Sequence, residues 1–184
     1  MGSLTSFLND LRASYVLSYA DVYIIDLEFE DMDFSVIGMR GNASFETIVE
    51  HFTSMGGEVV LLDPDYVYGR DMIESAAEHA VRAFEHGMNR SKTILTETII
   101  YAASERQISK ALSRMKPKDG RMEYVALLID IPDPKLDEIG MTRDDSLIEG
   151  TPEKAERLGL INEMGIPCED LALERVALID LAKY

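Results

Sequence analysis

The chain has 184 residues, 46% of them hydrophobic, and a formal net charge of −16 at pH 7. This length and hydrophobic content fit one domain whose core needs neither a metal nor a disulfide. The acidic balance argues against a general nucleic-acid coat protein and against binding to anionic membranes, because both ligands are recognised by basic surfaces.

The cysteine count, the apolar runs and the N-terminal sequence together indicate the compartment in which the protein resides. With one cysteine, Cys168, the chain cannot form an intramolecular disulfide. No apolar run approaches the ~20 residues of a membrane span, and the N-terminus lacks the basic start and apolar block of a signal peptide. We therefore expect a cytoplasmic protein that does not enter the membrane.

The first half of the chain alternates strand and helix patterns. In chain order we predict a loosely packed helix or arm over 1–20, strands over 21–29 and 35–40, a helix over 44–55, a buried strand over 58–62 and a helix over 70–86. Ser44 is placed to cap the first of the two longer helices, and Gly56 and Gly57 to end it.

The middle of the chain predicts two consecutive helices and a strand. The first covers 93–103, and Ser104 with Gln107 matches a capping box that would open the second. Pro117 and the pair Asp119-Gly120 then turn the chain into a strand over 121–131. Its segment 124–129 is apolar at every position, which is typical of a central strand covered on both faces.

The last third is acidic and then helical. Residues 132–150 indicate a loop with a short helix or an edge strand, Thr151 and Pro152 begin a helix that runs to about 164, and a last helix runs from 168 to about 182. The predicted fold is α/β in the mixed α+β sense: a single domain, 1–184, in which a mixed, mostly antiparallel sheet packs with several helices.

The sequence contains no recognisable catalytic motif. It has no phosphate-binding glycine loop, no dinucleotide fingerprint and no Gly-x-Ser-x-Gly elbow. His79 and His86 share a helix face but lie ~10 Å apart along its axis, too far to bind one metal ion together. We therefore predict a protein that is not an enzyme and needs no cofactor.

One segment reverses the charge of the chain. Residues 90–121 contain eight basic and three acidic side chains, a net charge of +5, which leaves −21 for the remainder. Arg106, Lys110 and Arg114 are four residues apart and form one stripe along a helix. A helix N-terminus beside Tyr101 would add free N–H groups for an anion such as phosphate. The alternative interpretation is an ordinary solvated helix face.

The same segment carries a family resemblance. Its features are Lys92-Thr93, Leu95-Thr96-Glu97, Ile100-Tyr101, Arg106-Gln107-Ile108 with Ala111, Lys118-Asp119-Gly120, the upstream Leu62-Asp63-Pro64, and the final segment from Leu173 to Ile179. In this order and spacing they resemble the small non-catalytic KEOPS subunit, whose eukaryotic relatives are called p53-related-protein-kinase-binding proteins. The resemblance covers about residues 58–184. The family often has Ser-Gly where this chain has Ala103-Ser104.

The resemblance implies an adaptor rather than an enzyme. Members of that family dock onto the small atypical kinase/ATPase subunit of KEOPS, and they are implicated in holding the single-stranded 3′ CCA end of tRNA. They thereby support threonylcarbamoyl transfer to the adenosine beside the anticodon. We expect the tRNA end at Tyr101, Ser104, Arg106, Gln107 and Lys110, and the kinase partner at Leu171, Arg175, Leu178 and Ile179.

Two other functions stay open from the sequence. One is a stand-alone small-molecule or nucleotide-binding domain, an enzyme included, with an anion site at the helix elbow over 101–110. The other is a homo-oligomeric scaffold. An isolated protein that acts only with its partners would favour the adaptor over both.

Overall fold

The computed structural model describes residues 32–161 and 165–181, and in that part an antiparallel sheet has the strand order β2-β3-β1-β4. Its strands are β1 (Phe34–Gly41), β2 (Glu58–Leu62), β3 (Glu123–Ile129) and β4 (Met141–Arg143). The expected mixed α+β fold is confirmed, and every strand pair in this part is antiparallel. The predicted arm over 1–20 and strand over 21–29 lie outside the described residues.

Strand β3 is the central strand that its sequence predicted. It pairs with β1 on one side and with β2 on the other, so that Ile129 faces both Phe34 and Glu58. Its side chains alternate between two hydrophobic clusters, one on each face of the sheet, with Leu127 in the first and Leu128 in the second. Coverage on both faces explains why this strand is apolar at every position from 124 to 129.

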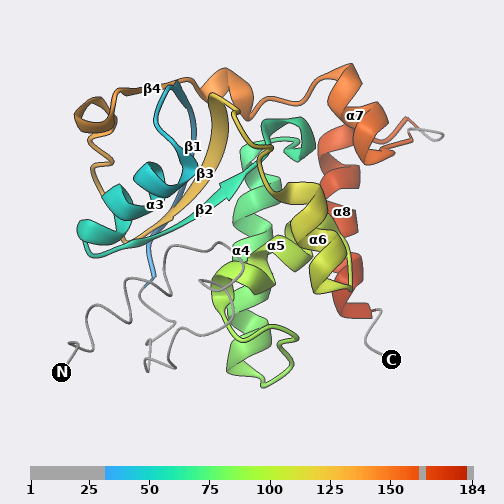
Figure 1. Ribbon diagram of the computed structural model, residues 1–184. Coiled ribbons are helices and arrows are strands. Elements are labelled where there is room, and N and C mark those ends of the chain that lie inside the picture. Colours follow the sequence, from blue (N-terminus) through green and yellow to red (C-terminus); the bar gives the residue numbers. More distant parts are fainter. Residues whose placement is uncertain (1–31, 162–164, 182–184) are drawn as a thin grey trace.

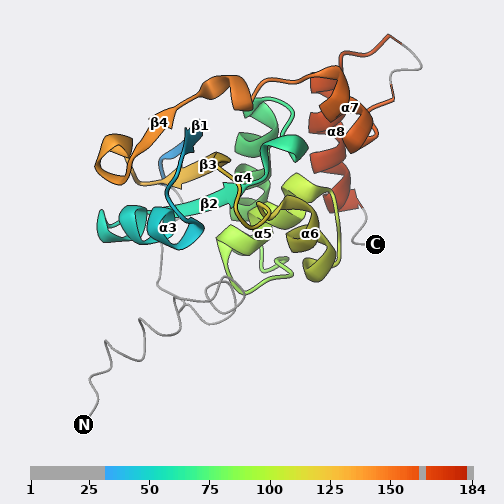
Figure 2. The same cartoon turned by 45° about the horizontal axis from the view of Figure 1, so that its top comes forward.

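Helices cover both faces of the sheet unequally (Figures 1 and 2). The helices are α3 (Phe45–Ser54), α4 (Arg70–Glu85), α5 (Ile94–Ala103), α6 (Ile108–Met115), α7 (Pro152–Leu158) and α8 (Cys168–Leu181). Helix α3 packs on one face together with the 3-10 turn Leu136–Ile139, whereas α4 and α5 pack on the other face. Helices α6 and α8 pack against α4 and α5 and complete the larger cluster. Three short 3-10 turns complete the described part: η2 (Pro64–Tyr66), η3 (Leu136–Ile139) and η4 (Asp145–Leu147).

Most predicted helix boundaries are correct. The hydroxyl of Ser44 accepts a hydrogen bond from the N–H of Thr47 at 3.2 Å, and that of Thr151 accepts one from Lys154 at 3.3 Å, as expected of N-caps. The predicted end of the α7 helix near residue 164 is wrong. The helix ends at Gly159, whose φ of 66° places it in the left-handed conformation that glycine adopts at little cost.

The junction between α5 and α6 differs from its prediction. Ser104 does not cap α6 but ends α5 in a left-handed conformation, with φ 49° and ψ 41°. The N–H of Ser104 donates to the carbonyl of Tyr101 and the N–H of Glu105 donates to that of Ile100, which is the Schellman pattern of a helix end. Helix α6 begins only at Ile108, so the capping-box prediction is wrong and residues 104–107 form an elbow between the helices.

Helix α5 is buried on nearly all sides. It packs against α4, α6 and α8, and of its ten residues only Leu95 is not buried. The carboxylate of Glu97 lies inside this packing. Its Oε2 accepts from the N–H groups of Arg90 and Ser91 and from the Ser91 hydroxyl at 2.7–2.9 Å. These bonds satisfy Oε2 and fix the loop that leads into α5, whereas the buried Oε1 has no hydrogen-bond partner among the described residues.

Candidate nucleic-acid and partner surfaces

Helix α6 presents its basic side chains outward. Only Ala111 and Met115 of this helix are buried, so the opposite side, with Arg106 just before it and Lys110 on it, faces solvent. Among the described residues, no salt bridge within 4 Å involves either of these two cations. Arg114 is partly engaged, because its Nη1 donates to the carbonyl of Ala103 at 3.0 Å. Arg106 and Lys110 therefore have their charge available for a ligand.

The start of α6 already holds an anion. Oε1 of Glu105 accepts a hydrogen bond from the N–H of Gln107 at 3.2 Å, next to the first turn of the helix. That bond, together with the nearby Lys110, lowers the pKa of Glu105, so its carboxylate is charged at neutral pH. A phosphate expected at this elbow, near Ser104 and Gln107, would have to displace the chain's own carboxylate.

A shallow open hollow lies next to the elbow, one turn further along α6. It is lined by Tyr66, Glu105, Ser109, Lys110, Ser113 and Arg114. Tyr66 comes from η2, a separate segment that the sequence prediction did not connect with the basic stripe. The only sequence signal for it was a tyrosine in the turn after Asp63 and Pro64, where the chain leaves a buried strand.

The segment that carries Tyr66 is fixed by ion pairs. Arg121 contacts Asp63 at 3.1 Å and Asp65 at 3.0 Å, and Arg157 of α7 contacts Asp65 at 2.7 Å. The hydrogen bond from Arg121 is the main reason why the pKa of the Asp65 carboxyl lies below its usual value. Arg121 thus serves the fold, although its charge belongs to the basic segment.

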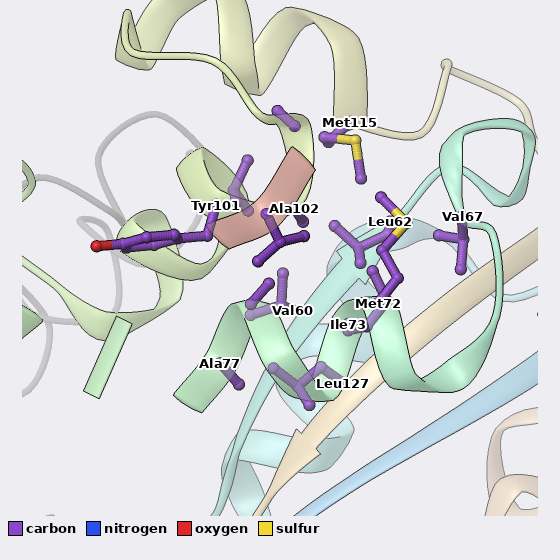
Figure 3. Packing of buried hydrophobic residues seen from close by; sticks show 14 of the residues in the cluster. Val60, Leu62, Val67, Met72, Ile73, Ala77, Tyr101, Ala102, Met115 and Leu127 are labelled. Carbon is purple, nitrogen blue, oxygen red and sulfur yellow. The ribbon is translucent and has the colours of Figure 1, made fainter. Parts of the chain in front are cut away.

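Tyr101 lies in the interior, in contrast to the expectation that it would face a ligand. Its side chain is fully buried, and its hydroxyl donates to Oδ1 of Asp180 at 2.5 Å. The other oxygen of Asp180 lies 2.6 Å from Nδ1 of His79, whose ring stacks on that of Tyr101 with centroids 5.3 Å apart. Burial and the Asp180 carboxylate raise the pKa of the Tyr101 hydroxyl, which therefore stays protonated. Figure 3 shows its oxygen pointing away from the other labelled core residues.

The four residues expected at the kinase partner have different environments on α8. Leu178 is 46% exposed, whereas Ile179 is 5% exposed and belongs to the core. Leu171 is half-buried against the same core, and Arg175 lines a narrow crevice together with Ser104 and Arg114. Leu181, which the sequence prediction omitted, is 71% exposed and lies three residues after Leu178, so both leucines share one outward side.

Comparison with known proteins assigns a family. Residues 42–166 match the family described as "Kinase binding protein CGI-121", which is more than half of the chain. The chain belongs to this family. It is the KEOPS subunit family that the sequence resemblance indicated. No curated protein matches the chain closely enough to name a nearer relative.

The family match covers one candidate surface and not the other. It runs from before α3 to just after α7, so it includes η2, the elbow and α6 with the hollow. It stops before α8, which carries the exposed leucines. The two surfaces therefore differ in what the match says about them: the basic one lies on the family's shared part, and the apolar one lies beyond it.

The described residues contain neither a helix that could cross a membrane nor a cluster of metal-ligating side chains. In 32–161 and 165–181, no helix is both long and apolar enough to cross a membrane. The same ranges contain no group of three histidine, cysteine or acidic side chains placed to hold a metal ion. His79, which the sequence left unassigned, is bonded to Asp180.

Proposed function

We propose that this protein is a non-catalytic adaptor of KEOPS that binds the small atypical kinase/ATPase subunit and the 3′ CCA end of tRNA. In this role it supports threonylcarbamoyl modification of the adenosine beside the anticodon. The observation that carries the proposal is the match of residues 42–166 to a family of kinase binding proteins. The tRNA part has separate support from the chemistry of one surface.

That support is the contrast between α6 and the rest of the chain. Arg106 and Lys110 are exposed next to the hollow, in a segment of net charge +5, while the remainder carries −21. Phosphate contacts dominate the affinity of most nucleic-acid complexes, and surrounding negative charge confines an RNA to the basic segment. A surface of this size fits a few single-stranded nucleotides rather than a duplex.

A double charge reversal tests the tRNA site. We expect Arg106→Glu with Lys110→Glu to reduce tRNA affinity by at least tenfold at fixed salt, measured by fluorescence anisotropy, because two phosphate contacts become repulsive. The matched control is Arg82→Glu with Lys135→Glu, which changes the net charge equally at exposed positions outside the hollow. Equal affinity of both double variants would show that the site lies elsewhere.

A single substitution on α8 tests the kinase surface. Leu178→Glu places a charge on an exposed apolar side chain, so the fold should remain intact while docking is lost. The measurement is co-purification with the kinase subunit, after circular dichroism has shown a folded variant. Met122→Glu is the control, since Met122 is 53% exposed on another part of the surface. If the folded Leu178→Glu variant still co-purifies, the partner surface is not on this side of α8.

The alternative of a stand-alone nucleotide-binding domain has less support. It required a free anion site at the elbow over 101–110, where Tyr101 is buried and Glu105 occupies the N–H of Gln107. Turnover, or tight nucleotide binding, by the isolated protein would reverse this preference.

A further inference from the structure

We propose that Tyr66 is the aromatic platform on which a base of the bound single-stranded RNA stacks. Phosphate contacts would come from Lys110 and Arg114, on the same hollow. The proposal rests on the proposed function and adds to it a residue that neither the sequence motifs nor the family match assigns. In the proposed RNA site, Tyr66 takes the place of Tyr101, whose ring is buried and cannot stack on a base.

The position of Tyr66 meets the first requirement for stacking. Its side chain is half-buried: part of it packs against the main core cluster, and part of it lines the hollow. In the proposal the core supports the ring on one side, and a base contacts the part of the ring that the core leaves uncovered. Among the described residues that line this hollow, Tyr66 is the only aromatic one.

The segment under Tyr66 is held in place before any ligand arrives. The N–H of Asp63 donates to the carbonyl of Met115 at 2.8 Å, which ties the start of η2 to the end of α6. The N–H of Tyr66 donates to the carbonyl of Asp63 at 3.0 Å, and Arg121 bridges Asp63 and Asp65. The ring and the cations of α6 therefore keep a fixed relation, so binding loses little conformational entropy.

The lining of the hollow fits a nucleotide better than an acidic peptide. An aromatic ring offers stacking to any base, and Lys110 and Arg114 can neutralise the one negative charge of each phosphodiester. The hydroxyls of Ser109 and Ser113 add donors for phosphate or ribose oxygens. The charged carboxylate of Glu105 on the same hollow repels phosphates as well as acidic side chains, but it can accept hydrogen bonds from the amino groups of cytosine and adenine, which an acidic side chain lacks.

Salt dependence separates stacking from phosphate binding. The probe is a labelled eight-nucleotide single-stranded RNA that ends in CCA, titrated by fluorescence anisotropy at several salt concentrations. We expect Tyr66→Ala to weaken binding about ten- to a hundredfold, the loss that base stacking on an aromatic residue causes, with an unchanged salt slope. Tyr66→Phe should bind within about twofold of the unmodified protein. Lys110→Ala should reduce the slope by about 0.7, since one phosphate contact is lost.

The outcomes distinguish this proposal from the function on which it rests. If folded Tyr66→Ala binds like the unmodified protein while Arg106→Glu with Lys110→Glu binds weakly, the platform is wrong and the tRNA site stands. If none of these variants changes the affinity, both fail. Should Tyr66→Ala not fold, Tyr66→Leu keeps the apolar contact with the core but lacks an aromatic face. Weaker binding by Tyr66→Leu then supports the platform, and unchanged affinity overturns it.

Discussion

Helices α5 and α6 follow each other in the chain and pack together, yet they have opposite relations to solvent. In α5 nine of ten residues are buried, including Glu97 and Tyr101. In α6 two of eight are buried, and the exposed side carries Lys110 and Arg114. Polar groups in the two helices therefore have different tasks, although they come from one continuous segment of sequence.

The difference is in what each polar group contacts. Glu97 and Tyr101 are bonded within the protein, the first to the 90–91 loop and the second to Asp180 of α8. They connect α5 to its neighbours, and a buried polar group without such partners would be costly. Lys110, by contrast, has no salt bridge among the described residues. The buried contacts make α5 important for stability, whereas α6 is the helix to which we assign ligand binding in our proposal.

The largest expected difference between the two helices is the effect on stability of a substitution at Tyr101 in α5 and at Lys110 in α6. We expect Tyr101→Ala to lower the free energy of unfolding by about 3–5 kcal/mol, because it leaves a cavity and removes the bond to Asp180. Lys110→Ala should change it by less than about 0.5 kcal/mol, as is usual for surface positions. Urea unfolding measures both. A loss below about 1 kcal/mol for Tyr101→Ala would contradict the assignment of this residue to the core.

The stability that the turn η2 beside α6 contributes should depend on the ion pairs of Asp65, and therefore on pH. The pKa of Asp65 is lowered in the folded protein, so its contribution to stability is full at neutral pH and is lost as the pH falls below its usual value of 3.8. We expect Asp65→Asn to cost about 1–2 kcal/mol at pH 7, since the side chain is partly exposed, and progressively less as the pH falls below 3.8. Urea unfolding of both proteins across this pH range measures the difference.

The control for this prediction is Glu138→Gln, which removes an exposed carboxylate outside the network of Asp65 and Arg121. We expect its effect to stay below about 0.5 kcal/mol at every pH. A cost of Asp65→Asn that does not change with pH would mean that packing, rather than charge, holds η2.

The sequence predicted most of the elements because their signals are local. Serine and threonine caps, helix-ending glycines and the apolar run of β3 each depend on a few neighbouring residues, and the structure confirms Ser44, Thr151 and the central position of β3. The elbow was misread because a serine before a helix and a serine after one look alike in sequence. Only the backbone angles of Ser104 show which it is.

The surfaces were harder to predict because they combine distant segments. The fold brings Tyr66 of η2 next to α6, and it buries Tyr101 with its hydroxyl bonded to Asp180, which lies 79 residues later in the chain. Helical spacing identified Lys110 as an outward side chain of α6, but the expected stripe is shorter than predicted, because Arg106 lies in the elbow before that helix begins. The spacing did not show that Ile179 points inward and Leu181 outward. Spacing within a helix predicts which residues share a side, whereas the neighbours of that side come from tertiary packing.

The smallest expected change in stability comes from the backbone conformation of Ser104, at the junction between α5 and α6. Ser104 has a positive φ, which costs a residue with a side chain about 1 kcal/mol relative to glycine, and the resemblance places glycine here in many family members. We expect Ser104→Gly to raise the free energy of unfolding by about 0.5 kcal/mol, because relief of this strain exceeds the added entropy of the unfolded chain.

Ser113→Gly is the matched control, since it makes the same change inside α6 and should lower stability by about 0.5 kcal/mol. Opposite signs in urea unfolding would confirm that α5 ends at Ser104. If both variants lose stability, residue 104 is helical in solution and the elbow begins later.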